Sequence, residues 1–418
     1  MANQEKYQER LKRINDAIAL KEPDTIPFIP IVQCYPFLQA GYSMADILYD
    51  WDLSKTRKSL FQYLDDYQPD AMFGHGYVYA GQGPILEKGM PKTMRWAGEP
   101  GAAVDKNSIH QFIEFPVLED DEFEQFFTDR SGWVMNVGMP RTNGILEPMA
   151  GFKVRDMGVY NSYTAVAAAV STPEFKKMLE TLWEINDMNN DLSPRLRQLD
   201  ADIEAYGYPV LATGGAGVPY DGYSDFLRGT LDGLADLYER PDQVMDYCKE
   251  QLEGVLEMIK IQGKMMPGKH VFMALHKGMD GFMSDEHYRT FYWNHLQIII
   301  NAIIENGMVP YIYTEGKYDS RLECLKEVPA GKVVYHFEEV DMAQAKKILG
   351  DTACISGGFP VYLLDYGTKE QVVNEAKRLI DTCAVGGGFI FETSCGMDLA
   401  KRENVEALMD TVRNYGKK

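Results

Sequence analysis

Val309-Pro-Tyr-Ile-Tyr-Thr-Glu-Gly316 is a short run of β-branched and aromatic residues that ends in a polar residue and a glycine, which is the pattern of a β-strand and its following turn. Two later runs have the same form: residues 332–335 lead into His336, and residues 389–391 lead into Glu392-Thr-Ser-Cys395. Helical patterns lie between and after these runs, at residues 319–328, 342–349, 369–384 and 404–415. Strands that alternate with helices in this way predict parallel neighbours joined by right-handed crossovers.

The same alternation extends through the rest of the chain and gives eight predicted strands. They cover residues 26–32, 71–79, 203–212 and 271–275, and four more start at Val309, Lys332, Ala353 and Gly387. An amphipathic helix at residues 4–19 precedes the first strand. We therefore predict an α/β protein with a (β/α)8 TIM barrel and N-terminal helices, in which the carboxyl ends of all strands open onto the face that carries the chemistry.

Residues 81–150 interrupt this alternation. Glycine and proline are frequent there, and the segment has too little apolar periodicity to build a core of its own. We interpret it as a long insertion after the second strand, within a single barrel that spans residues 1–418.

The charge and the hydropathy of the chain exclude several functions. The formal net charge is −20, from 62 acidic and 42 basic residues, and no lysine or arginine cluster is present to follow a phosphate backbone. No apolar run reaches the length of about 18 residues typical of a membrane-spanning helix, and the N-terminus lacks the basic-then-apolar order of a signal peptide. We expect a cytoplasmic protein that binds neither nucleic acid nor a membrane.

Three metal-capable side chains follow three different predicted strands: Glu315, His336 and Cys395. Because the carboxyl ends of parallel strands share one rim, we expect these side chains to lie near one another. Carboxylate, imidazole and thiolate are all zinc ligands, and a catalytic zinc site uses three ligands with a fourth position open. The alternative is an ion-paired Glu, a hydrogen-bonded His and a buried Cys, and the sequence spacing alone favours that alternative.

Two further residues near strand ends are candidates for catalysis. His276 follows the predicted strand at residues 271–275 and precedes Lys277-Gly278. An imidazole there is suited to act as an acid or base, or as an alternative metal ligand, and a structural histidine that bonds a carbonyl is an equally simple interpretation. Tyr313 lies two residues before Glu315. We predict that His276 and Tyr313 are catalytic residues.

Four stretches together resemble the uroporphyrinogen decarboxylase superfamily. They are Pro310-Tyr-Ile-Tyr-Thr-Glu-Gly-Lys-Tyr318, Val333-Val-Tyr-His-Phe337, Ala353-Cys-Ile-Ser-Gly-Gly-Phe-Pro360 and Gly386-Gly-Gly-Phe-Ile-Phe391. The resemblance covers nearly the whole chain, is strongest over residues 270–416, and implies a (β/α)8 barrel. True decarboxylases of this superfamily carry arginines just after the first strand to hold the carboxylates of a tetrapyrrole, whereas residues 29–37 here contain no arginine.

The other branch of the superfamily consists of zinc-dependent methyltransferases that work with a corrinoid protein. Its coenzyme M methyltransferases have a His-x-Cys at the positions that match Tyr313 and Glu315, and a later Cys near the position of Cys395. This chain keeps only the later Cys, which makes a thiol substrate a poor match and leaves His336 as the replacement for the missing imidazole.

The resemblance thus implies a zinc-dependent methyltransferase. In this hypothesis, zinc polarises the oxygen of a small-molecule methyl donor, such as a methoxylated aromatic, and the methyl group passes to cobalamin held by a separate corrinoid protein. Two alternatives stay open. One is decarboxylation of a tetrapyrrole without a metal, and the other is a barrel that only binds a corrinoid or tetrapyrrole.

Overall fold

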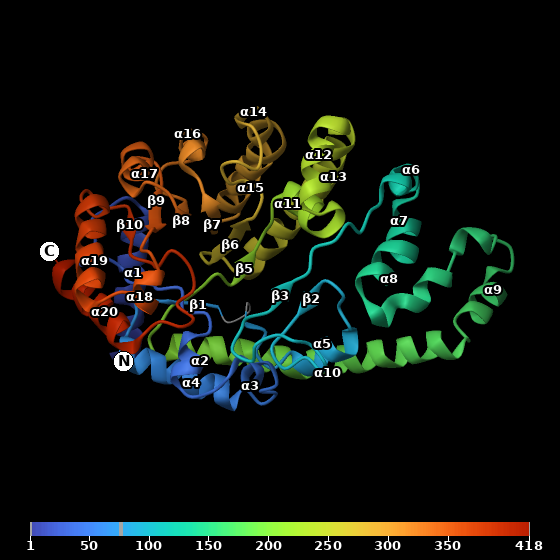
Figure 1. Ribbon diagram of the computed structural model, residues 1–418, viewed down its shortest axis with the longest axis horizontal. Coiled ribbons are helices and arrows are strands. Elements are labelled where there is room, and N and C mark those ends of the chain that lie inside the picture. Colours follow the sequence, from blue (N-terminus) through green and yellow to red (C-terminus); the bar gives the residue numbers. More distant parts are fainter. Residues whose placement is uncertain (1, 75–77, 418) are drawn as a thin grey trace.

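The computed structural model describes residues 2–74 and 78–417. At its centre lies a parallel six-stranded sheet with the order β10-β9-β8-β7-β6-β5 (Figure 1). The strands are β5 (Gly214–Gly215), β6 (His270–Leu275), β7 (Val309–Lys317), β8 (Val334–Glu339), β9 (Cys354–Gly357) and β10 (Phe389–Ile390). The register pairs Leu275 with Thr314 and Tyr313 with His336, so it fixes which side chains of β6, β7 and β8 lie at the same level.

Backbone contacts beyond both edges of this sheet continue it into a ring. Next to β10, Phe28 forms a parallel bridge with Phe391, and the Asp70 amide donates to the Phe28 carbonyl. β1 (Met72–Phe73) then pairs in parallel with β4 (Val210–Leu211), which precedes β5 in the chain. The strand positions follow one another in TIM-barrel order, as predicted, but the strands of the described residues form separate sheets and no continuous closed barrel.

Two of the predicted strands are much shorter than expected. Residues 26–32 form only the bridge at Phe28, because Pro27 and Pro30 lack the amide hydrogen that a ladder needs. The predicted strand at residues 71–79 shrinks to β1, and residues 75–77 of that range lie outside the described residues.

The third predicted strand, residues 203–212, is wrong over its first part. Residues 203–205 belong to the long helix α10 (Pro173–Ala205), where Ile203 is buried on the core-facing side. Thr172 caps the start of α10, since its side chain accepts a hydrogen bond from the Phe175 amide, and Pro173 occupies the first turn. An amphipathic helical face therefore continues where the sequence pattern suggested a strand.

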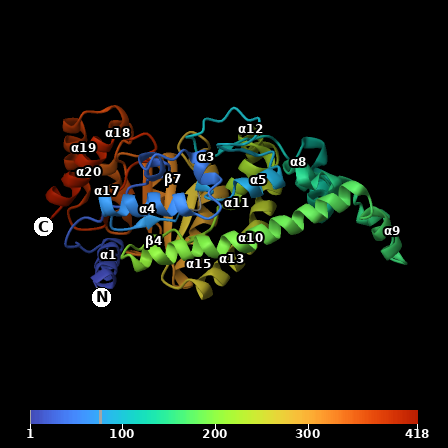
Figure 2. The ribbon, with the colours of Figure 1, turned by 90° about the horizontal axis from the view of Figure 1, so that it is seen from below.

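Helices surround the ring of strands (Figures 1 and 2). The N-terminal helix α1 (Ala2–Ile18) buries Ile14, Ala17 and Ile18 in the apolar cluster that also contains residues of β1, β4, β7, β8, β9 and β10. The other helices of the ring and its connections are α2 (Tyr35–Gln39), α3 (Met44–Leu48), α4 (Ser54–Tyr67), α11 (Pro219–Tyr223), η6 (Ser224–Arg228), α12 (Thr230–Glu239), α13 (Pro241–Met265), α14 (Asp285–His287), η7 (Tyr288–Trp293), α15 (Asn294–Glu305), η8 (Asp319–Arg321), α16 (Leu322–Leu325), α17 (Met342–Leu349), α18 (Tyr362–Tyr366), α19 (Lys369–Cys383) and α20 (Arg402–Tyr415).

Residues 81–150, which we interpret as an insertion, are fully described and contribute no strand to the ring. They contain α5 (Gly83–Gly89), the antiparallel pair β2 (Met94–Arg95) and β3 (Gln111–Phe112), η2 (Asp120–Glu122), α6 (Phe123–Thr128), α7 (Arg130–Trp133), η3 (Val134–Gly138), α8 (Met139–Thr142) and η4 (Gly144–Gly151). η5 (Val154–Asp156) and α9 (Ser162–Ala169) follow and lead to the outer end of α10 (Figures 1 and 2). In the described part of the chain, no helix is long and apolar enough to cross a membrane.

Candidate active site

Five polar side chains meet at the carboxyl ends of β6 and β7, and we call them the mouth cluster. They are Glu114, Asp225, His276, Lys277 and Glu315. His276 and Lys277 directly follow β6, and Glu315 lies near the end of β7. Asp225 comes from η6, and Glu114 comes from the segment after β3. Strand-end position therefore brings together residues that are far apart in the sequence.

His276 lies between two carboxylates. Its Nδ1 atom is 2.5 Å from Oδ2 of Asp225, and its Nε2 atom is 3.8 Å from Oε1 of Glu315. The second distance is too long for a hydrogen bond, so Nε2 has room for a ligand atom. The His276 side chain is 37% exposed and that of Asp225 only 6%, so one ring nitrogen is anchored inside the protein while the other faces the opening.

The hydrogen bond that His276 donates to Asp225 raises the pKa of His276 to about 9, and the nearby Glu315 carboxylate acts in the same direction. Burial acts to raise the pKa of the Asp225 carboxyl. The hydrogen bonds that Asp225 accepts from His276 and Lys277 outweigh burial, so the pKa of Asp225 is lowered. His276 is therefore an imidazolium at neutral pH. Its Nε2–H points to the side where Glu315 lies, which is the arrangement of a general acid.

Lys277 adds a second cation on the other side of Asp225. Its Nζ atom is 2.9 Å from Oδ1 of Asp225 and 2.8 Å from the Thr230 hydroxyl, with Oε2 of Glu114 at 3.5 Å. Glu114 also accepts from the amide and the hydroxyl of Thr230, at 2.7 and 2.6 Å. Glu114 thus attaches the segment after β3 to the mouth of the ring.

Asp221 holds the backbone of the turn that carries His276 and Lys277. It accepts hydrogen bonds from the amides of His276 and Lys277, at 3.3 and 2.9 Å, and from the Tyr292 hydroxyl at 2.6 Å. Full burial raises the pKa of Asp221 to about 7. Since Asp221 and Asp225 are four residues apart across α11 and η6, one helical turn orients both the backbone and the side chain of His276.

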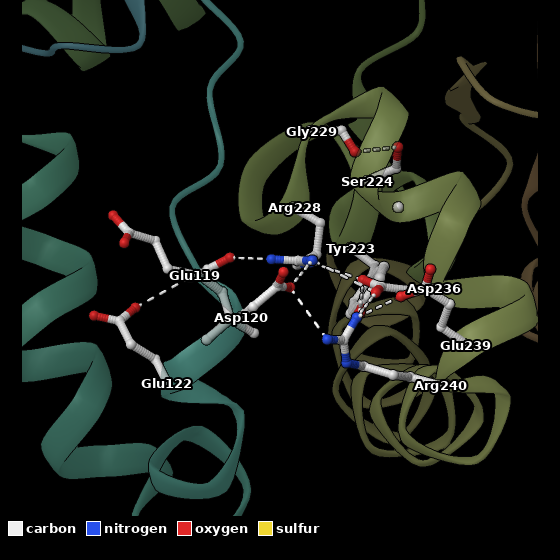
Figure 3. Close-up of polar contacts among 12 residues, drawn as sticks. Glu119, Asp120, Glu122, Tyr223, Ser224, Arg228, Gly229, Asp236, Glu239 and Arg240 are labelled. Atoms are coloured by element: carbon white, nitrogen blue, oxygen red, sulfur yellow. Dashed lines mark hydrogen bonds and ion pairs between the residues drawn. The ribbon is translucent and has the colours of Figure 1, made fainter.

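An ion-pair network around the buried Arg228 and Asp236 fixes the helix that carries Asp225 (Figure 3). Nε of Arg228 lies 2.7 Å from Oδ2 of Asp236, which also accepts from the Tyr223 hydroxyl at 2.7 Å. Nη2 of Arg228 reaches Asp120 in η2, also at 2.7 Å. Arg240 bridges the same two carboxylates. The network therefore ties η6 and α12 to the inserted segment.

The structure places His336 away from this opening. β8 extends to Glu339, beyond the predicted strand end at residue 335, so His336 lies inside the strand and is fully buried. Its Nδ1 atom is 2.5 Å from Oε2 of Glu392, and its Nε2 atom is 3.1 Å from the Ser394 carbonyl oxygen. Because a carbonyl oxygen only accepts, Nε2 donates to it, and neither ring nitrogen of His336 is left for a metal.

Around His336, the barrel interior forms a polar network. Glu392 also accepts from the hydroxyls of Ser356, at 2.7 Å, and Tyr311. The Tyr313 ring stacks on the imidazole, with ring centroids 4.5 Å apart, and its hydroxyl donates to the Ser394 carbonyl at 3.2 Å. Burial raises the pKa of Tyr313, so the phenol stays protonated. The predicted catalytic role of Tyr313 stays a prediction.

Glu315 and Cys395 both lie toward the rim, where each is partly exposed. Burial raises the pKa of the Cys395 thiol and of the Glu315 carboxyl. Among the residues that the structure describes, no three His, Cys, Asp or Glu side chains are grouped so that they could hold one metal ion. Glu315, His336 and Cys395 as arranged here therefore do not fit a zinc site, and zinc binding by the chain stays a prediction.

Four of the residues that build the site were not predicted from the sequence: Glu114, Asp221, Asp225 and Lys277. Asp221 and Asp225 lie in a helix about fifty residues before His276 in the chain, as their contacts with it show. Their spacing of four residues in Pro219-Tyr-Asp-Gly-Tyr-Ser-Asp225 was the available signal, because it places both carboxylates on one face of a helix.

The chain belongs to the uroporphyrinogen decarboxylase (URO-D) family, whose model matches residues 156–415. A solved structure, a methyltransferase from Methanosarcina mazei, is similar to it with a TM-score of 0.59 and 14% sequence identity, covering 96% of this chain and 98% of that one. At this identity the similarity shows the fold alone. No curated protein matches the chain.

Proposed function

We propose that this protein is a methyltransferase that moves a methyl group from an oxygen atom of a small-molecule donor to a corrinoid protein. The observation that carries the proposal is the position of His276, whose Nδ1 is anchored to Asp225 at 2.5 Å while Nε2 is directed to the mouth. Family membership and the fold shared with a protein named a methyltransferase support the class of reaction. The absence of arginine in residues 29–37 makes a polycarboxylate substrate a weaker match.

Methyl transfer from an ether is difficult because the leaving oxygen is a poor leaving group. As the carbon–oxygen bond breaks, its electron pair stays on the oxygen, and Nε2 of His276 delivers a proton there. General acid catalysis of this kind contributes about 10²–10⁴-fold to a rate. A reduced corrinoid on the partner protein supplies the electron pair for the new bond to the methyl carbon.

The other residues of the mouth cluster keep His276 in its acid form and in position. Asp225 stabilises the imidazolium, and Lys277 neutralises the second oxygen of Asp225 at 2.9 Å. Glu315 lies opposite Nε2 at 3.8 Å and accepts a hydrogen bond from a hydroxyl of the donor or of the demethylated product.

Zinc and the identity of the methyl donor remain part of the hypothesis drawn from the sequence. Because Glu315, His336 and Cys395 do not fit one zinc ion as placed, we derive no step through zinc. Elemental mass spectrometry on wild type and on Glu315→Ala, His336→Ala and Cys395→Ala checks this separately. Zinc that is bound by the wild type and lost in all three variants would restore the predicted site.

The direct test mixes the purified chain with a reduced corrinoid protein and a panel of methoxylated aromatics, and follows methylation of the corrinoid by its visible absorption. We expect transfer from at least one donor, and strongly reduced transfer in His276→Gln. Carbon dioxide release from a porphyrinogen by the wild type, with no methyl transfer, would favour the decarboxylase alternative. Tight corrinoid or tetrapyrrole binding without turnover would favour a binding protein. Either outcome would overturn the proposal.

A further inference from the structure

Negative charge is in excess at the mouth of the ring, where four carboxylates face two cations. The cations are His276 and Lys277, and the carboxylates are Glu114, Asp225, Glu315 and Glu338. Glu338 lies near the end of β8 and makes no ion pair with the residues that the structure describes. The mouth is therefore negatively charged even when His276 is an imidazolium.

The two outer carboxylates, Glu315 and Glu338, lie on the neighbouring strands β7 and β8. Oε2 of Glu338 accepts a hydrogen bond at 2.6 Å from the amide of Gly316, the residue next to Glu315. Burial raises the pKa of Glu315, and repulsion by Glu338 adds to that effect. Burial also raises the pKa values of Tyr313 and Cys395, and Glu338 again acts in the same direction. The charge of Glu338 is therefore felt across this side of the rim.

Lys277 has no capacity left to bind an anionic ligand. Its side chain is 11% exposed, and its ammonium group lies against three oxygen atoms. They belong to Asp225 at 2.9 Å, to the Thr230 hydroxyl at 2.8 Å and to Glu114 at 3.5 Å. Because an ammonium group has three N–H donors, these oxygens occupy all of them.

His276 has one N–H left, and the proposed reaction already uses it. Since Nδ1 is bonded to Asp225, only Nε2 can donate to a ligand. In the proposed function, on which this inference rests, Nε2 delivers a proton to the leaving oxygen of the donor. A carboxylate at Nε2 would displace that oxygen, and Glu315, 3.8 Å from Nε2, would repel the carboxylate.

We infer that Glu315 and Glu338 make the mouth selective for methyl donors that carry no anionic group. A donor whose leaving oxygen lies at Nε2 of His276 is small, so any charge on it stays near Glu315. Salt screens charges only beyond a Debye length of about 8 Å. Like charges that are brought this close in a partly dry site disfavour binding by about 10-fold or more. Methoxylated acids are rejected, and neutral ethers of the same size are accepted.

The test compares two donors of the same shape that differ in charge, 4-hydroxy-3-methoxybenzoate and 4-hydroxy-3-methoxybenzamide. Calorimetry on the purified chain measures the dissociation constant of each compound, and the corrinoid assay measures kcat/KM. We expect the wild type to prefer the amide by about 10-fold or more in both measurements. Glu315→Gln and Glu338→Gln should each reduce this preference several-fold, because each removes one repelling charge.

Glu339→Gln is the matched control. It removes the same charge one residue further along β8, where successive side chains of a strand point to opposite faces, and Glu339 is exposed. The preference for the amide should stay as in the wild type. Because the preference is a ratio of two kcat/KM values from one preparation, a variant that folds only in part still gives a valid result.

The outcomes separate this inference from the proposed function. Preference for the amide in binding, without methyl transfer, would uphold the selectivity and overturn the proposed function. Methyl transfer with an equal or higher kcat/KM for the acid would overturn the selectivity and leave the proposed function intact. A preference that Glu339→Gln lowers as much as Glu338→Gln would also overturn the selectivity. A chain that binds neither compound would overturn both.

Discussion

His276 directly follows β6 and His336 lies in β8, with β7 between these two strands, and each imidazole pairs with a carboxylate. In both, Nδ1 lies 2.5 Å from a carboxylate oxygen, of Asp225 in one and Glu392 in the other. They differ at Nε2: that of His336 donates to the Ser394 carbonyl, whereas that of His276 lies 3.8 Å from Glu315 and makes no hydrogen bond with the residues that the structure describes. Side-chain exposure is 37% for His276 and 0% for His336.

A histidine–carboxylate pair therefore serves two purposes in this protein, depending on how deeply it is buried in the ring of strands. At the strand end, one imidazole nitrogen is committed and the other is open to a ligand, which suits chemistry. In the middle of β8, both nitrogens are committed and the pair holds the barrel interior together. The four predictions that follow test this division of roles.

The largest expected effect is on activity, at His276. His276→Gln removes the proton donor but keeps a side chain of similar size. The rate of methyl transfer should fall by about 10²–10⁴-fold, because general acid catalysis contributes a factor of that size. The free energy of unfolding in urea should fall much less than the activity, because the side chain is partly exposed and the Gln amide can still donate to Asp225. Single-turnover kinetics with one methoxylated donor measures the first quantity. Full activity in this variant would assign the acid role elsewhere.

The second effect is on stability, at the buried pair. Glu392→Ala leaves the His336 imidazole without its carboxylate inside the ring, and breaking a buried pair typically costs about 3–5 kcal/mol. Urea unfolding followed by fluorescence measures the loss. His276→Gln, which changes the partly exposed member of the other pair, is the matched control and should cost less. Equal losses for both variants would remove the distinction between the two histidines.

The third effect is on pH dependence. The pKa of His276 is raised from 6.5 to about 9, so a general acid should lose activity as the pH rises through about 9. The stabilising contribution of the His276–Asp225 pair follows the same sign: it is fully present below pH 6.5 and is lost as the pH rises through about 9.

Asp225→Asn sharpens that prediction, because the hydrogen bond that His276 donates to Asp225 is the largest cause of the raised pKa of His276. The basic limb of kcat/KM should move down toward pH 6.5, while the folded structure is retained. A limb that stays near pH 9 in this variant would mean that a group other than His276 produces it.

The smallest effect is expected at Glu114, which attaches the inserted segment to the mouth. Glu114→Gln keeps the size but weakens the bonds to Thr230 and Lys277, and loss of such hydrogen bonds costs about 0.5–1.5 kcal/mol. We expect a several-fold increase in KM for the donor with kcat nearly unchanged. A large loss of kcat would place Glu114 among the groups that take part in the chemistry.

The positions of many strands in the ring could be predicted from the sequence, because strands that are buried on both faces appear as short apolar runs between helices. β6, β7, β9 and β10 lie at or close to the predicted positions. The errors have local causes. Pro27 and Pro30 lack the amide hydrogens that the first strand would need to pair with its neighbours. The helical periodicity of α10 continued through residues 203–205, which had been assigned to the third strand.

The residues of the candidate site could be predicted from the sequence only in part. The sequence indicated correctly that His276 and Cys395 follow strands, because a strand end can be located from the residues beside it. Glu315 was also predicted to follow a strand, but it lies within β7, which extends to Lys317. The sequence could not indicate that β8 extends past His336, since strand length depends on pairing with β7 and β9. The depth of a side chain in the ring is therefore a property of the register and not of the local pattern.

Residue order alone established an α/β chain with parallel strands, a strongly acidic surface and a set of polar side chains near strand ends. Those properties depend on local pattern and composition, which act over a few residues. Only the folded chain decided which histidine faces the opening, because that choice depends on contacts between segments far apart in sequence. Asp225 in η6 meets His276 after β6, and Glu392 after β10 meets His336 in β8.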